Sequence, residues 1–150
     1  MSDYPKRIRL SRAKGWRLPP GTVRVGRPSR WGNPFIVGKH GTREQCAAKF
    51  YQLAGGFISF SEDIETETQM TMYRRVRRQI SDLAGKDLAC WCALDGGACH
   101  ADVLLVLANP GMPLPKWMTT PTELPRMRLG MDARDIERLK REKMRKQRLL

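Results

Sequence analysis

The spacing of apolar and polar residues along the chain predicts short strands separated by helices. Valines alternate with polar residues over positions 22–27, which is typical of a half-buried strand. Positions 87–92 form a short apolar run of the kind found in buried strands, and a brief alternation at Ile8 and Leu10 predicts an arm or an edge strand. These three segments are the candidates for a sheet.

Three further segments carry apolar residues at helical spacing. Thr42 and Gln45 form a capping-box signature at the start of a helix that ends at Gly55-Gly56. A second helix has its apolar face over residues 72–83, with four arginines pointing elsewhere, and a third covers residues 100–108. Helices therefore alternate with the predicted strands.

This order of elements predicts the α/β class. A strand followed by a loop and a helix favours a small, single-domain, Rossmann-like mixed sheet flanked by helices, with its site at the carboxyl ends of the strands. We assign this domain to residues 1–109. Five prolines mark residues 110–125 as a linker, and residues 126–150 have the composition of a basic helical tail, which folds alone or on a partner.

The positive charge is concentrated at the two ends of the chain, whose net charge is +13. Residues 1–30 carry nine Lys and Arg against one Asp, and residues 126–150 carry ten against four acids, so the middle is close to neutral. Because phosphates neutralised by Lys and Arg release counterions, this distribution favours nucleic acid, DNA or RNA, as the partner. The alternative is a tail that only keeps the protein in solution.

The sequence predicts a cytoplasmic protein. No apolar run approaches the roughly 20 residues of a membrane span, and no signal peptide precedes the domain, so we expect no membrane partner. The four cysteines are then reduced, and three of them, Cys90, Cys92 and Cys99, cluster in the sequence.

The segment from Cys90 to Asp102 carries the most specific chemistry. Its three thiols and the imidazole of His100 are a possible zinc set, because thiolate and imidazole suit that ion and four donors close a tetrahedron. In a second interpretation Cys99, His100 and Asp102 are catalytic, since the start of a helix lowers the pKa of a thiol and attracts an anion. In a third interpretation the cysteines fill small apolar gaps in the core, and His100 and Asp102 only stabilise the start of the helix.

The loop at 27–35 follows the first strand and is a candidate nucleotide pocket. Its arginines can bind phosphate, Trp31 can stack on a base, and Asn33 can read a base edge. The residues assigned to nucleotide binding are Arg27, Ser29, Arg30, Trp31, Gly32 and Asn33. The structural alternative is a rigid turn in which Trp31 and Phe35 belong to the core.

Three blocks of sequence resemble the motifs of a known family. They are K-G-W-R-L-P-P-G-T-V at 14–23, V-G-R-P-S-R-W-G-N-P-F at 25–35, and G-K-D-L-A-C-W-C with C-H-A-D-V-L-L within 85–105. In this order they are similar to DUF4326, an uncharacterised domain family of bacteriophages and their bacterial hosts, over residues 5–109. The resemblance implies a phage or mobile-element setting in a bacterial cell and a contact between the W-G-N-P-F and C-H-A-D blocks. It brings no established activity with it.

Two functions of different classes are compatible with these observations. The first is a nucleotide- or nucleic-acid-associated protein with an active or ligand pocket between the W-G-N-P-F loop and the start of the helix at His100. The second is a noncatalytic nucleic-acid-binding or host-interaction protein with a structural Cys/His segment. The sequence lacks the H-x-E and P-C-x-x-C motifs of zinc deaminases, and it also lacks a P-loop and a dinucleotide fingerprint, which argues against those enzyme classes.

Overall fold

A three-stranded parallel sheet positions the rest of the structure. In the computed structural model, which describes residues 4–120 and 129–149, strand β4 (Leu88–Cys90) lies between β1 (Arg7–Arg9) and β2 (Val23–Arg24). Leu88 is paired with Arg7 on one side and with Val23 on the other. All three residues of β4 are buried, as expected for the inner strand of a parallel sheet.

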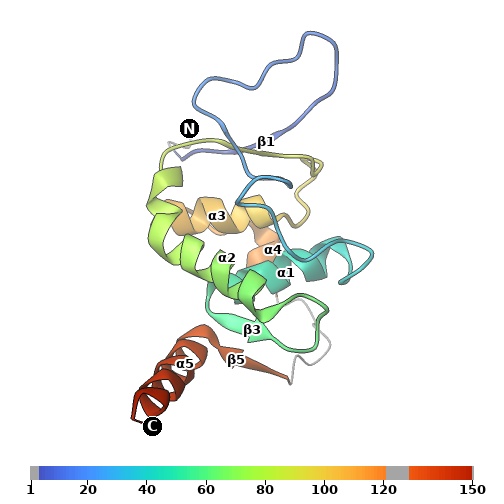
Figure 1. Ribbon diagram of the computed structural model, residues 1–150. Helices are drawn as coiled ribbons and strands as arrows, with labels where there is room; N and C mark the ends of the chain where they lie inside the picture. Colours follow the sequence, from blue (N-terminus) through green and yellow to red (C-terminus); the bar gives the residue numbers. More distant parts are fainter. Residues whose placement is uncertain (1–3, 121–128, 150) are drawn as a thin grey trace.

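Helices flank this sheet, so the predicted α/β class is confirmed (Figure 1). Helix α1 (Arg43–Ala54) begins at the predicted capping box, in which Thr42 and Gln45 bond to each other's backbone. Helix α3 (His100–Ala108) has the predicted bounds. Helix α2 (Thr66–Gln79) begins six residues before the periodic pattern and ends in a short 3-10 helix, η1 (Ile80–Leu83).

A second, two-stranded sheet connects the body to the basic tail. Strand β3 (Phe57–Ser59) pairs antiparallel with β5 (Gly130–Asp132), and helix α5 (Ala133–Arg148) follows β5 directly. Neither strand is predicted by the sequence pattern, because three residues are too few to show a period. The two strands tie residues 130–132, inside the predicted tail, to the domain.

The segment predicted as a linker contains a helical turn, α4 (Lys116–Thr119). Trp117 and Met112 pack against the core from this segment. Residues 121–125 lie outside the described part of the chain, so the domain boundaries at 109 and 125 remain predictions.

The two basic ends of the chain lie at opposite ends of the molecule (Figure 1). The long loop between β1 and β2 projects at one end, and α5 projects at the other. The two basic segments therefore do not form one small patch on the surface. Within residues 4–120 and 129–149, no helix combines the length and the apolar character that a membrane span requires.

Candidate metal and ligand site

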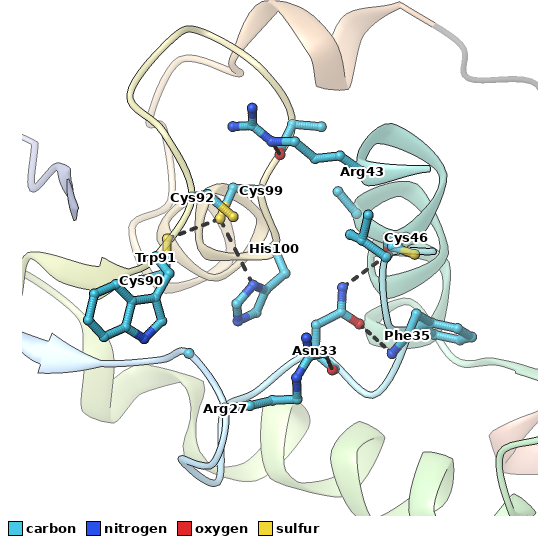
Figure 2. Close-up of a pocket in the computed structure, with 14 residues that line it drawn as sticks. Arg27, Asn33, Phe35, Arg43, Cys46, Cys90, Trp91, Cys92, Cys99 and His100 are labelled. Atoms are coloured by element: carbon cyan, nitrogen blue, oxygen red, sulfur yellow. Dashed lines mark hydrogen bonds between the residues drawn. The ribbon is translucent and has the colours of Figure 1, made fainter. Parts of the chain in front are cut away.

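A cavity of about 200 Å³ opens at the carboxyl ends of β2 and β4. The 26–35 loop forms one side of it and the Cys90–His100 segment forms the other, with α1 closing the space between them (Figure 2). The lining residues are Gly26, Arg27, Asn33, Phe35, Val37, Arg43, Cys46, Ala47, Cys90, Trp91, Cys92, Ala98, Cys99 and His100. Crevices at this edge of a parallel sheet are where α/β proteins bind ligands.

Three sulfur atoms gather on one wall of this cavity. The Sγ atoms of Cys90, Cys92 and Cys99 all lie within 4.8 Å of one another, and those of Cys90 and Cys99 are 3.3 Å apart (Figure 2). Cys90 ends β4, Cys92 lies two residues beyond it, and Cys99 immediately precedes α3. Three thiols at this spacing are a group that could hold a metal ion.

The three thiols also set one another's protonation. Hydrogen bonds from Cys92 and Cys99 lower the pKa of Cys90, because they stabilise a thiolate there. The same contact with Cys90 raises the pKa of Cys92 and, most strongly, that of Cys99. The cluster therefore favours a single thiolate at Cys90.

Arg7 and Arg43 hold the loop that carries the thiols, and the sequence analysis missed both. Arg7 donates to the carbonyl oxygens of Cys92 and Ala93 at 3.1 Å each, and its Nη1 lies 3.8 Å from the Cys90 sulfur. Arg43 donates to the carbonyl of Ala93 and, through Nε at 2.7 Å, to that of Ala98. No motif marks these residues, because both act on backbone carbonyls far away in the sequence.

His100 is buried beside the thiols as a neutral imidazole. Its Nε2 lies 2.8 Å from the carbonyl oxygen of Val25, and because a carbonyl only accepts, that nitrogen carries the proton. Burial lowers the pKa of His100, so the ring stays uncharged and Nδ1 keeps its lone pair. Nδ1 is 4.0 Å from the sulfur of Cys99.

Asp102 does not orient His100, contrary to the catalytic interpretation. Its Oδ2 accepts a hydrogen bond from Trp117 Nε1 at 2.8 Å, and its Oδ1 lies 3.4 Å from Nε of Arg7. Residues two apart on a helix point in different directions, which separates this carboxylate from the imidazole. Burial raises the pKa of Asp102. Of the proposed catalytic residues, only Cys99 and His100 face the cavity.

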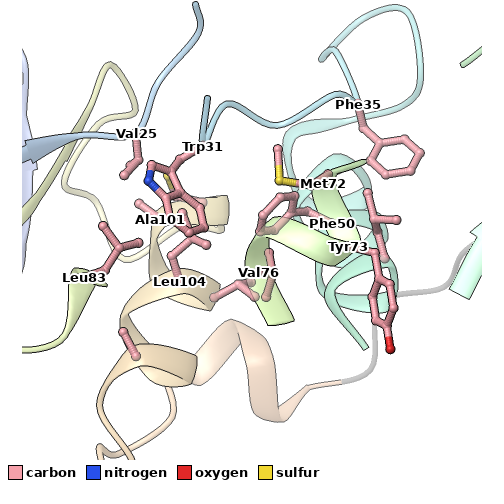
Figure 3. Close-up of a cluster of buried hydrophobic side chains, with 14 of the residues drawn as sticks. Val25, Trp31, Phe35, Phe50, Met72, Tyr73, Val76, Leu83, Ala101 and Leu104 are labelled. Atoms are coloured by element: carbon pink, nitrogen blue, oxygen red, sulfur yellow. The ribbon is translucent and has the colours of Figure 1, made fainter. Parts of the chain in front are cut away.

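Trp31 is a core residue and has no face open to a base. Its side chain is 2% exposed and packs among Val25, Ala101 and Leu104 (Figure 3). The stacking role predicted from the sequence is therefore replaced by the structural alternative, in which Trp31 and Phe35 are buried. A tryptophan in the W-G-N-P-F motif is compatible with stacking on a base and with packing in the core. The sequence alone could therefore not decide between these two roles.

The polar atoms of Asn33 are also engaged within the fold. Its amide nitrogen donates to the carbonyl of Cys46 at 3.1 Å, and its Oδ1 accepts from the backbone N–H of Phe35 at 2.9 Å. These bonds fix the 27–35 loop against α1. Gly32 is required by close packing, since a Cβ atom there would lie 2.8 Å from Cγ of Arg27.

The remaining loop residues face a second, open hollow on the other side of the loop. This hollow has a volume of about 570 Å³ and lies against α2. Arg27, Ser29, Arg30, Gly32 and Asn33 all line it, and Trp31 does not. Arg30 is half-exposed, with its guanidinium 3.9 Å from Asp82. Only Arg27 and Asn33, of the six predicted nucleotide-binding residues, line the thiol cavity as well.

Residues 8–110 match the family model described as Domain of unknown function (DUF4326). The chain belongs to this family. No curated protein and no solved structure matches it. All the residues of the thiol cavity fall inside the DUF4326 domain, whereas α5 lies beyond its end.

The DUF4326 domain exposes one aromatic residue at its cavity that the sequence analysis did not single out. Trp91 lies between two of the clustered cysteines, yet 44% of it is exposed. Strand β4 ends at Cys90 and the chain bends at Trp91 and Cys92, so the indole leaves the core that Cys90 enters.

We predict that Trp31→Ala lowers the free energy of unfolding of the DUF4326 domain by about 3–5 kcal/mol, because it leaves a cavity in the core. Urea unfolding followed by circular dichroism measures this change, and Trp31→Phe gives a smaller loss if the alanine variant does not fold. Trp16→Ala, at a half-buried tryptophan outside the core, serves as the control. An unchanged unfolding midpoint for Trp31→Ala would contradict the core assignment.

Proposed function

We propose that this protein holds a zinc ion with Cys90, Cys92 and Cys99, and binds a nucleotide, free or within a nucleic acid, in the cavity beside it. The observation that carries the proposal is the group of three sulfur atoms on the wall of a cavity that also presents an arginine. Zinc bound by three protein ligands has a fourth position for water or a ligand, which is the pattern of ligand-binding and catalytic zinc sites.

The spacing of the sulfur atoms fits zinc. Tetrahedral zinc with bonds of about 2.3 Å to sulfur requires sulfur atoms about 3.8 Å apart. The sulfur atoms of Cys90 and Cys99 are 3.3 Å apart, and all three lie within 4.8 Å of one another. The observed separations, from 3.3 Å to at most 4.8 Å, therefore include the value that zinc requires.

The charge around the cluster supports the same ion. Three thiolates and Zn²⁺ carry a net charge of −1, which is costly in a buried place without a counter-charge. The side chain of Arg7 is 8% exposed and lies next to Cys90, so its guanidinium brings a positive charge to the cluster. Asp102 shares this guanidinium at 3.4 Å, but burial raises the pKa of that carboxyl and so weakens its competing negative charge. Arg43 holds the same loop, but its guanidinium is paired with both carboxylate oxygens of Asp95 at 3.0 Å, so Arg7 is the cation on which this argument depends.

The protonation of His100 suits a role next to the metal. Imidazoles that bind zinc usually donate their other ring N–H to a backbone carbonyl or a carboxylate. His100 makes this contact with Val25 and turns its Nδ1 toward Cys99. The donors that lie within 4.8 Å of one another are the three thiols and do not include His100, the fourth member of the zinc set predicted from the sequence. We therefore place the imidazole beside the metal, where Nδ1 can accept a hydrogen bond from a ligand in the fourth position.

Arg27 supports an anionic ligand. Its Nη1 donates to the carbonyl of Asn33 at 2.8 Å, which fixes the guanidinium at the cavity wall with other N–H groups left for a ligand. The sheet edge is the usual place for nucleotides in α/β proteins. A phosphate or a base carbonyl bound in this cavity would share its wall with Arg27 and with the three cysteines that would hold the metal.

We predict stoichiometric zinc in protein purified without a metal-affinity step and measured by mass spectrometry. Serine at Cys90, Cys92 or Cys99 removes a thiolate and abolishes zinc binding. Cys46→Ser retains it, because the Cys46 thiol lines the same cavity but lies outside the sulfur cluster and contacts the carbonyl of Gly41. Equal zinc loss in the Cys46 variant, or wild-type protein that takes up no zinc, would contradict the proposal.

Thiol reactivity provides a readout that does not depend on the variants folding. In the zinc-loaded wild type all four thiols should react slowly with a disulfide reagent, Cys46 because it is buried and the other three because zinc holds them. A chelator should speed the reaction of the cluster, first at the half-buried Cys92, and leave Cys46 slow. Reactivity that is the same with and without the chelator would contradict a thiolate-bound metal.

The second candidate, a noncatalytic nucleic-acid-binding protein, is favoured by the arrangement of α5. Its first turns are fixed to the body, by Ile136, which is buried in the core, and by an ion pair between Glu137 and Arg74 of α2 at 3.2 Å. Lys140 also pairs with Glu67. The following turns extend beyond the body and carry a row of exposed cations (Figure 1).

We predict that replacing Lys143, Arg145 and Lys146 together with Gln weakens nucleic-acid binding and reduces the slope of log affinity against log salt by about 2–3. The matched control replaces three exposed lysines of the body, Lys39, Lys86 and Lys116. Fluorescence anisotropy over a salt series measures both. Equal losses of affinity and equal changes of slope in the two triple variants would show that α5 contributes no more to nucleic-acid binding than the other exposed lysines do.

A further inference from the structure

The cavity is too small for a whole nucleotide. Pockets that enclose small ligands have volumes of roughly 300–1,000 Å³, whereas this cavity has about 200 Å³. A ligand of nucleotide size must therefore extend over the rim. The residues at that rim decide what kind of ligand the cavity can take.

Trp91 forms the rim and is shared by two hollows. It lines the thiol cavity on one side and, on the other, an open hollow of about 560 Å³ formed with Arg9, Leu10, Ser11 and Arg12. A path over the indole thus connects the cavity with a surface that bears two arginines. Figure 2 shows the indole outside the sulfur cluster, toward the edge of the cavity.

Arg12 already occupies one face of Trp91. Its guanidinium carbon lies 4.8 Å from the centre of the ring, and the rest of the residue is exposed. A planar cation on an exposed indole is bound weakly enough to be displaced. A nucleobase can take its place on the ring, and the displaced guanidinium is then next to the phosphate of the same strand.

We infer that Trp91 is a stacking platform for an unpaired base, and that the ligand of this protein is single-stranded nucleic acid, of which only part of one nucleotide enters the thiol cavity while the neighbouring base stacks on Trp91 at the rim. The inference rests on the proposed function and specifies its ligand. Arg9 and Arg12 bind the backbone of the strand as it leaves the cavity across Trp91. A base in a duplex cannot reach this ring, because both of its faces are covered by neighbouring pairs.

The test compares Trp91→Ala, Trp91→Phe and a control, Trp16→Ala, in binding to a short labelled oligothymidine. We expect Trp91→Ala to weaken binding roughly 5- to 150-fold, which corresponds to the loss of one base stacked on an aromatic ring. Trp91→Phe keeps most of the affinity. Zinc content and thermal stability stay unchanged in the two Trp91 variants, because 44% of Trp91 is exposed and its side chain is not a metal ligand.

The salt dependence separates stacking from charge. Trp91→Ala leaves the slope of log affinity against log salt unchanged, whereas Arg12→Gln reduces it by about 1, since it removes one phosphate contact. Trp91→Ala that binds oligothymidine as well as wild type overturns the inference, as does stronger binding of a hairpin duplex than of the single strand.

Different failures point to different parts of the account. Wild type that binds zinc and a mononucleotide, but no oligothymidine, overturns the single-strand inference and leaves the proposed function standing. Wild type that binds zinc and neither nucleotide nor oligonucleotide overturns the nucleotide part of the proposed function together with this inference.

Discussion

The pairing of β4 with a parallel strand on each side is the constraint on which the site depends. Leu88, Ala89 and Cys90 are at most 2% exposed, and each side of the strand is hydrogen-bonded. Because the three strands run in the same direction, their carboxyl ends meet, and Cys90 enters the space beside Gly26. The chain must then turn before α3, and this turn returns Cys99 to the sulfur of Cys90.

The same cations that hold the turn also make its thiols suitable for a metal. Arg7 reaches from β1 to the carbonyls of Cys92 and Ala93 and to the Cys90 sulfur. It therefore connects the register of the sheet to both the shape and the charge of the thiol cluster. Asp102 and Trp117 pack behind Arg7, so the segment after α3 supports the cluster without reaching the cavity. Asp102, which the sequence motif would assign to catalysis, thus contributes to the thiol cluster by holding the side chain of Arg7 in place.

The sequence pattern could predict the α/β class, α1 with its capping box, the bounds of α3 and the inner strand. It could do so because the spacing of apolar residues shows which face of an element is buried, and capping residues lie next to the helix that they cap. The three clustered cysteines could be identified in the same way. The roles of Trp31 and Trp91 could not, since exposure depends on which face each residue turns to the core, and here the tryptophan of W-G-N-P-F is buried while that of C-W-C is open. Arg7 escaped notice because its partners are more than 80 residues away.

Zinc K-edge X-ray absorption of the zinc-loaded wild type tests the central claim most directly, because it counts the atoms bound to the metal. The account predicts about three sulfur atoms at about 2.3 Å and one nitrogen or oxygen at about 2.0–2.2 Å. The coordination should not change in Cys46→Ser. A spectrum with only nitrogen and oxygen ligands, or with a single sulfur, would contradict a metal held by Cys90, Cys92 and Cys99.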